Sequence, residues 1–338
     1  MDVDRRAVAL GFLGAALLVG GLVAVVGVGE LTAALAAVDS RSMALLCLLG
    51  LGWLAAWGTT LRAVLGSLDG AVSRRLSFLL YASAAFANNV TPFGQAGGEP
   101  IAALLISRST GSDYERGLAA IASVDALNFV PSIGMALVGL AVYATRFAVG
   151  ERVRSVFVLV VGLAVAALLG AAILWRVRDR VVTATASTGD ALLRAVDDRL
   201  PRVSLDGVRP GERIRGFFTA VSRVAADRRA LAVAGTFSLL GWLALVATLW
   251  LTLGVLGAAV PVAVVLLVVP VSTVASIAPL PGGAGGVEAA IVLVLVPTTS
   301  VSPAVAGAAA IVYRVATYWV PTVLGAGAAA WLSGRTAA

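Results

Sequence analysis

The chain has 338 residues, of which 60% are hydrophobic and 13% are charged, and its mean hydropathy is +0.99. A soluble core does not need so much apolar sequence, so the composition predicts an integral membrane protein. Its 25 basic and 18 acidic residues leave a net charge of +7, and every basic residue is Arg because Lys and His are both absent. The composition therefore excludes Schiff-base and His-based chemistry, and it gives no reason to expect a metal, a cofactor or a nucleic-acid partner.

Six apolar runs are long enough to cross about 30 Å of hydrocarbon as helices. They fall at about 7–29, 43–66, 117–145, 155–175, 230–256 and 304–332. The first is longer than the apolar core of a signal peptide, about 7–15 residues, so we expect it to remain as a spanning helix. The sequence predicts an all-α polytopic membrane protein with about six spanning helices, built as a single transmembrane domain over residues 1–338.

Two groups of shorter apolar runs interrupt this series. The first group comprises runs at 78–90 and 101–106, and the second comprises runs at 262–278 and about 287–296. At a rise of about 1.5 Å per residue, the shorter piece of each group cannot cross the bilayer. A Gly/Pro-rich motif separates the two runs of each group, and irregular backbone is tolerated at membrane depth only where protein or water covers it. We expect each group to form a re-entrant helical hairpin with the motif at its tip.

The two Gly/Pro-rich motifs match each other. The first reads NNVTPFGQAGGEP over 88–100, and the second reads APLPGGAGGVE over 278–288. In each motif a glutamate follows a proline by seven residues. These pairs are Pro92 with Glu99 and Pro281 with Glu288. Equal spacing in both motifs indicates a duplicated unit.

The match continues downstream of the motifs. A lone charge in an apolar run stands 26 residues after each glutamate, and it is Asp125 in the first copy and Arg314 in the second. A proline and then a glycine follow each of these charges. We interpret the duplication as repeat 1 at about 73–145 and repeat 2 at about 261–332.

The distribution of Arg predicts the orientation. Arg74 and Arg75 precede the first hairpin and the segment at about 176–229 is Arg-rich, whereas the connections near 257–261 and 297–303 carry no charge. The positive-inside rule then places both termini and the Arg-rich segment in the cytoplasm, at the cell membrane. We expect that segment to form amphipathic helices on the membrane surface, with a plain linker as the alternative. Three crossings separate the hairpins, so the repeats are inverted, an arrangement in which transporters build a midplane site.

The motif residues have both functional and structural interpretations. Their glycines permit positive φ, and successive N–H groups in such turns can form an anion-binding nest whose natural ligand is a phosphate. Alternatively, the glycines only let the two hairpin tips cross. Glu99 and Glu288 also have two interpretations: they belong to the functional site, or they cap the N-termini of the short helices. An unpaired charge inside a span is expensive, so we expect Asp125 and Arg314 to pair with each other or with a lipid headgroup.

We expect a lipid-binding site and no catalytic residue. The candidate lipid-binding residues are Asn89, Pro92, Gln95, Gly97, Gly98, Glu99, Asp125, Asn128, Gly283, Gly285, Gly286, Glu288, Tyr313, Arg314 and Tyr318.

The chain resembles the flippase-like integral membrane family to which the transmembrane region of lysylphosphatidylglycerol synthase belongs. The resemblance covers about residues 5–335. It rests on Asn89, Pro92 and Gly97-Gly98-Glu99, on the second motif, and on Tyr313-Arg314, Tyr318 and Pro321. It implies movement of a lipid across the bilayer: aminoacylated phosphatidylglycerol in the fused bacterial enzymes, or polyprenyl-linked sugars in stand-alone relatives.

Two departures limit what the resemblance implies. Ala102 and Ala103 stand where family members often carry a basic residue, and the chain ends at Ala338 without the soluble aminoacyl-transferase domain of the synthase. We therefore expect no transferase reaction. The expected function is a lipid flippase for a phosphate-containing lipid, either a phospholipid or a polyprenyl-phosphate-linked sugar. The alternatives are a non-transporting membrane scaffold and an intramembrane subunit of a lipid-linked glycosyl transfer system.

The expected partners follow from this function. We expect the protein to bind membrane lipids. A glycosyltransferase or an aminoacyl-lipid synthase is a candidate protein partner, and the chain is also a candidate for homo-oligomer formation.

Overall fold

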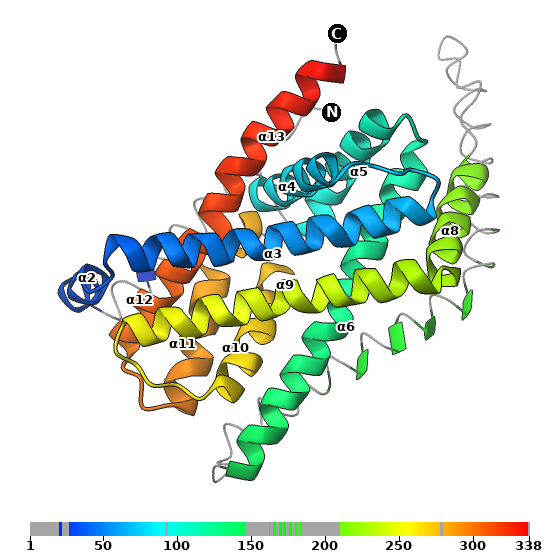
Figure 1. The fold of residues 1–338 in the computed structure, drawn as a ribbon. Coiled ribbons are helices and arrows are strands. Elements are labelled where there is room, and N and C mark those ends of the chain that lie inside the picture. The colour runs from blue at the N-terminus through cyan, green and yellow to red at the C-terminus, as the bar shows by residue number, and fades with distance from the viewer. Residues whose placement is uncertain are drawn as a thin grey trace, which may run out of the picture.

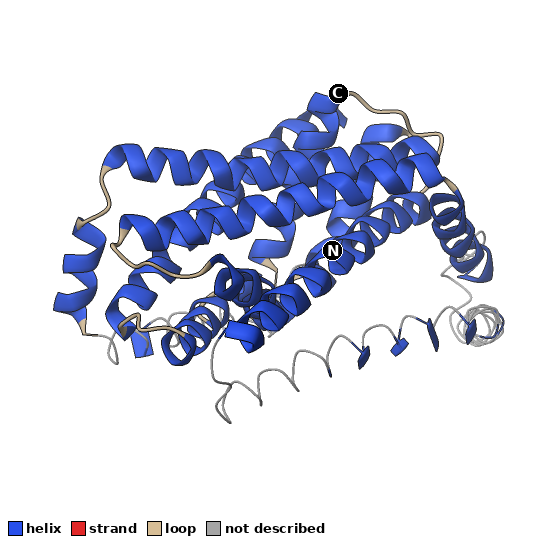
Figure 2. Cartoon of the chain, turned by 60° about the horizontal axis from the view of Figure 1, so that its bottom comes forward, coloured by secondary structure: helices blue, strands red, loops and turns tan. Residues whose placement is uncertain are grey.

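The computed structural model describes residues 27–91, 94–146, 210–277 and 280–336, together with Gly20, Gly21 and scattered residues between 162 and 183. Throughout these ranges every regular element is a helix (Figures 1 and 2). Five helical runs are long and apolar enough to cross a membrane, which confirms the prediction of an all-α polytopic membrane protein. They are Ser40–Ser67, Tyr114–Thr145, Arg228–Val255, Pro281–Thr298 and Pro303–Arg335.

Four of the six expected spans are present as long helices. Three are the single helices α3 (Ser40–Ser67), α6 (Tyr114–Arg146) and α9 (Arg228–Val255). The fourth is a continuous run of α12 (Pro303–Arg314), a π-helical turn η3 (Val315–Trp319) and α13 (Val320–Thr336). The spans expected at 7–29 and 155–175 lie almost wholly outside the described residues, and the short helix α2 (Val28–Ala36) precedes α3.

Helices α3 and α9 lie side by side and form the centre of the bundle (Figure 1). Trp57 Nε1 donates a hydrogen bond to the Ser238 carbonyl at 3.1 Å, and Thr60 Oγ1 donates to the Ala234 carbonyl at 3.2 Å. A side chain at Gly241 would collide with the indole of Trp57. In hydrocarbon, close packing and interhelical hydrogen bonds rather than burial from water hold helices together, and this contact provides both.

The first hairpin consists of α4 (Arg74–Val90) and α5 (Gln95–Thr110). The sequence predicts that the short helix begins near residue 101, but α5 begins six residues earlier and contains the glycine pair of the motif. The reason is packing, since a Cβ atom at Gly98 would collide with the side chain of Asn88 and the backbone of Ala87 on α4. Gly98 therefore lets α4 and α5 cross closely without requiring a positive φ.

The second hairpin consists of α10 (Val262–Val274), two 3₁₀ turns, and α11 (Gly286–Thr298). The turns are η1 (Ala275–Ile277) and η2 (Pro281–Gly283). At about 1.5 Å per residue, α10 and α11 each reach only about 20 Å, and η2 and α11 together make up the 18-residue run Pro281–Thr298 among the five long apolar runs. The re-entrant course of the hairpin stays a prediction. Here the backbone needs glycine, because φ is +53°, +65° and +81° at Gly282, Gly283 and Gly285.

The tips of the two hairpins touch. In Figure 1, α4 and α5 lie above the α3–α9 pair while α10 and α11 lie below it. A Cβ atom at Gly94 would stand 3.0 Å from the Ser276 carbonyl oxygen, and one at Gly282 would collide with Asn89 and Tyr318. The tips therefore meet inside the bundle, as the hairpin prediction requires, while the inverted symmetry of the two repeats stays a prediction.

The described end of the expected amphipathic segment is a helix, α8 (Pro210–Ala226). Its apolar side buries Ala220 and Val224. Its polar side forms two ion pairs, Arg213 with Glu115 at 3.3 Å and Arg223 with Asp69 at 2.7 Å. These contacts hold α8 across the ends of α3 and α6.

Candidate functional site

A cavity of about 230 Å³ lies where the two hairpin tips meet. Its polar lining includes Asn88, Asn89, Asp125, Asn128, Tyr313 and Arg314. Pockets for drug-sized ligands have volumes of about 300–1,000 Å³. A cavity of this size therefore fits a lipid headgroup or part of one, but not the acyl chains.

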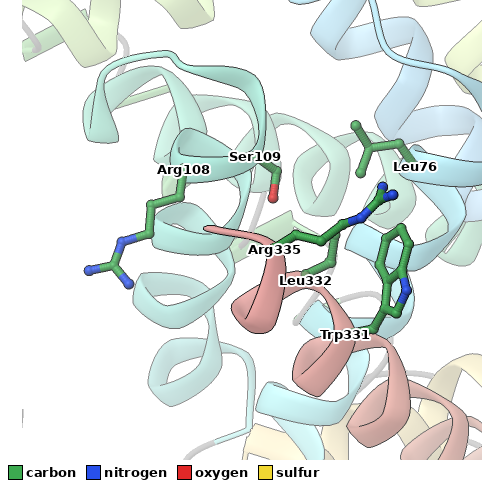
Figure 3. Close-up of a pocket in the computed structure, with 6 residues that line it drawn as sticks. All are labelled: Leu76, Arg108, Ser109, Trp331, Leu332 and Arg335. Atoms are coloured by element: carbon green, nitrogen blue, oxygen red, sulfur yellow. The ribbon is translucent and has the colours of Figure 1, made fainter. Parts of the chain in front are cut away.

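A larger cavity, of about 760 Å³, lies where α4 begins and where α5 and α13 end (Figure 3). Its two basic side chains do not converge: Arg335 lies over the ring of Trp331 at 4.3 Å, and Arg108 points away from both. The inner cavity, with charged groups inside the bundle, is the better candidate for a lipid site.

Arg314 is paired with Glu288. Its Nε donates to Glu288 Oε1 at 3.0 Å, and both side chains are about one-tenth exposed. Its Nη2 donates to the Gly282 carbonyl at 2.9 Å, and the guanidinium lies 3.9 Å from the ring centre of Tyr318. The expected pairing of Arg314 with Asp125 is therefore wrong, because Arg314 is already neutralised within its own hairpin unit.

Glu288 has two roles at once. While Oε1 accepts from Arg314, Oε2 accepts a hydrogen bond from the Gly285 N–H at 2.8 Å and caps the first turn of α11. The capping interpretation of Glu288 is therefore confirmed, while its place in a lipid site stays a prediction. The Gly285 amide, which the sequence suggested as part of a phosphate nest, is used by this carboxylate.

Tyr318 connects the two hairpin tips. Its hydroxyl lies within hydrogen-bond distance of the Asn89 carbonyl (3.1 Å) and the Pro281 carbonyl (3.4 Å). The Asn89 side chain donates to Thr322 Oγ1 at 2.8 Å. Both Tyr318 and the cavity-lining Thr317 lie on the π-helical turn η3, and such turns are frequent at functional sites.

Glu99 and Asp125 form an acid pair that the sequence analysis did not anticipate. Their carboxyl groups lie within interaction range of each other. Asp125 is 7% exposed, and its Oδ2 has no hydrogen-bond partner. Glu99 is the fifth residue of α5 and lies beyond its first turn, so the capping interpretation does not apply to it.

Asn128 lies one helical turn after Asp125 on α6 and is 5% exposed. Its Oδ1 accepts a hydrogen bond from Ser238 Oγ at 2.7 Å, and its Nδ2 has no partner. Trp242 Nε1 donates to the Asn128 carbonyl at 2.8 Å. These contacts fix Asn128 between α6 and α9 and leave one side of its amide toward the cavity.

An aromatic wall completes the cavity. Trp53, Trp57, Tyr81 and Trp242 all line it, and their rings meet edge to face with centre distances of 5.1–6.3 Å. Sequence reasoning missed these four residues because an aromatic residue in an apolar run is as typical of a lipid-facing position as of a binding site.

The other predicted site residues divide into three groups. Asn89 and Tyr313 line the cavity. Gly97, Gly283 and Gly286 belong to the hairpin tips but do not line the cavity. Pro92 and the side chain of Gln95 lie outside the described residues.

The chain matches the family described as "Lysylphosphatidylglycerol synthase TM region" over residues 8–325. Two similar proteins, both from Methanothermobacter thermautotrophicus, are each named "UPF0104 membrane protein". One is 28% identical over 331 residues, covering 95% of this chain and 92% of the relative. The other is 26% identical over 331 residues, covering 93% of this chain and 94% of the relative. The similarity thus extends over both hairpins.

Proposed function

The chain belongs to the family of the lysylphosphatidylglycerol synthase transmembrane region, and from this premise we propose that it is a lipid flippase. Its substrate is a phosphate-containing lipid, either a phospholipid or a polyprenyl-phosphate-linked sugar. The protein moves this lipid across the membrane without changing it chemically.

One observation carries the proposal: a polar cavity with charged side chains lies inside a bundle of spanning helices, where both hairpin tips meet. Ionisable groups at membrane depth are costly and mark substrate or ion pathways. Phe129 lines the cavity and is 48% exposed on the outer face of α6. A headgroup can therefore enter beside Phe129 while the acyl chains stay in the bilayer.

Arg314 is the residue that binds the phosphate. A guanidinium matches phosphate oxygens with two parallel hydrogen bonds. Because Glu288 already neutralises Arg314, a phosphate must share the guanidinium with this carboxylate or replace it. The Tyr318 ring against the guanidinium keeps Arg314 in place during the exchange.

The orientation follows from the distribution of Arg. Arg74, Arg213 and Arg335 lie at the end of the bundle where α4 and α6 begin and α13 ends. The protein lies in the plasma membrane, and by the positive-inside rule this end of the bundle faces the cytoplasm.

The proposal is tested with the purified full chain in liposomes that carry a fluorescent phosphatidylglycerol or a fluorescent polyprenyl phosphate. A membrane-impermeant reductant bleaches label in the outer leaflet alone, so label that crosses the bilayer is lost in a second, slower phase. We expect the protein to accelerate this phase for at least one of the two probes over protein-free liposomes. If the protein accelerates this phase for neither probe, the proposal is contradicted. The remaining alternatives are then a membrane scaffold or an intramembrane subunit, with a glycosyltransferase or an aminoacyl-lipid synthase as its partner.

A further inference from the structure

The two hairpin units bring equivalent residues together. In the second unit, Glu288 contacts the residue 26 positions later, which is Arg314. In the first unit, Glu99 lies within interaction range of the residue 26 positions later, which is Asp125. The pairing is equivalent in sequence, but the first unit has a carboxylate where the second has a guanidinium.

This exchange leaves the first unit without a cation. The Glu288–Arg314 pair is neutral as a whole, whereas two ionised carboxylates in contact repel each other strongly in an apolar bundle. The contact between Glu99 and Asp125 is stable only when a positive ion, in the simplest case a proton, lies between them. In the second unit, the guanidinium of Arg314 supplies the positive charge at the equivalent position.

No described side chain supplies that charge. Tyr81 of α4 lies within electrostatic reach of Asp125, and Tyr313 and Arg314 of α12 line the same cavity. The Arg314 guanidinium is bound by Glu288 and by the Gly282 carbonyl. The parts of α3, α9 and α10 that line the cavity contribute aromatic, apolar and hydroxyl groups.

Unpartnered polar atoms point to a ligand at this place. Two buried acceptors, Asp125 Oδ2 on α6 and Asn88 Oδ1 on α4, have no hydrogen-bond partner, and Asn128 Nδ2 is a buried donor without one. All three residues line the cavity. Buried polar atoms are normally satisfied, so this set calls for a polar occupant of the cavity, either a ligand or water. The described residues show no cluster of three or more metal-ligating side chains, which favours a monovalent ion over a divalent one.

We propose that Glu99 and Asp125 bind one monovalent cation, a proton or Na⁺, and that its binding couples lipid movement to the gradient of that ion. Ion binding does not depend on the flippase function, whereas coupling rests on the flippase function proposed above. With one cation bound, the pair carries one negative charge instead of two, so the electrostatic cost of moving the site between the two faces of the membrane falls. Without the cation, the two negative charges hold the site in place.

Ion binding is tested by infrared spectroscopy of the full chain in liposomes, in a buffer without Na⁺ at neutral pH. We expect the carbonyl stretch of a protonated carboxylic acid in the wild type and its loss in the double variant Glu99→Gln/Asp125→Asn. Asp113→Asn is the matched control and keeps the band, because the Asp113 side chain is largely exposed. If Na⁺ is the natural occupant, adding it removes the wild-type band. Identical spectra of the wild type and the double variant, with and without Na⁺, overturn the proposal.

Coupling is tested in the same liposomes with the fluorescent phosphatidylglycerol and an imposed gradient of pH or of Na⁺. We expect the label to accumulate in one leaflet in response to one of the two gradients and this accumulation to be lost in the double variant. Label movement that ignores both gradients overturns coupling. If the infrared band of the acid pair is present but the protein moves neither fluorescent probe, the flippase function is refuted. Ion binding by Glu99 and Asp125 is then still supported.

Discussion

Each hairpin unit pairs a glutamate with the residue 26 positions later, but the two pairs differ in charge. In the second unit, Glu288 neutralises Arg314 and caps α11, so both carboxylate oxygens of Glu288 have a partner. In the first unit, Asp125 is buried beside Glu99 with an unpartnered oxygen. The comparison teaches that two units with the same sequence spacing can differ in charge, so that one holds a satisfied ion pair and the other keeps unsatisfied atoms.

The largest expected effect concerns the anchor. Glu288→Gln leaves the buried guanidinium of Arg314 without its counter-charge, and removing one partner of a buried ion pair costs about 3–5 kcal/mol. We expect thermal unfolding in detergent to shift down by a corresponding amount. The double variant Glu288→Gln/Arg314→Gln should recover part of this loss, because neither buried charge remains. A single variant as stable as the wild type would contradict the assignment of this pair as the anchor.

The next effect concerns the crossing of α4 and α5. Gly98→Ala places a methyl group against Asn88 and the Ala87 backbone, and overpacking of this kind costs about 1–3 kcal/mol. Gly134→Ala on α6 is the matched control, because a Cβ atom at Gly134 has no neighbour within 4 Å and alanine favours a helix. Thermal unfolding of the two variants in detergent measures the difference. Equal stability would show that close crossing is not what Gly98 provides.

A smaller effect concerns the link between the hairpin tips. Tyr318→Phe keeps the ring that lies against Arg314 but removes the hydroxyl that reaches the Asn89 and Pro281 carbonyls. The loss of one such hydrogen bond costs about 0.5–1.5 kcal/mol. Backbone hydrogen exchange should then increase at both tips. An increase confined to the second hairpin would mean that the hydroxyl does not join the units.

The smallest effect lies outside both units, at the start of α3. The backbone N–H of Ser42 donates to the Asp39 carboxylate, and this hydrogen bond holds the pKa of Asp39 below its ordinary value. A lowered folded-state pKa means that the carboxylate stabilises the protein above the pKa of the unfolded chain, and that this stabilisation is lost as pH falls through the folded pKa. Asp39→Ala should lower the unfolding temperature slightly at neutral pH and not at acidic pH. A shift that is the same at both pH values would contradict this role.

Much of the fold could be predicted from the sequence. The apolar runs predicted the four described spans, because the thickness of the bilayer fixes the length of a spanning helix. The Gly/Pro motifs predicted the positions of both hairpins. The start of α5 was misplaced because the glycine pair was taken for a turn, whereas Gly98 serves a close helix crossing. Such a crossing depends on the neighbouring helix, which the local sequence does not contain.

The site was harder to predict. The equal 26-residue spacing is compatible with each glutamate pairing with the charge of its own unit. The prediction instead paired Asp125 with Arg314 across the units, because their charges are opposite. The contact in the second unit, between Glu288 and Arg314, shows that backbone geometry decides the partner. The aromatic wall could not be predicted, because its rings come together only through the packing of α3, α4 and α9.

The central claim is that Arg314, at the meeting point of the two hairpin tips, binds the phosphate of a lipid that crosses the membrane. The most direct measurement is movement of fluorescent phosphatidylglycerol or polyprenyl phosphate by the double variant Glu288→Gln/Arg314→Gln, which carries no buried unpaired charge at this place. Arg335→Gln, at the end of the bundle, is the matched control. The account predicts that the wild type and the control move the probe and that the double variant does not; movement by the double variant at the wild-type rate would contradict it.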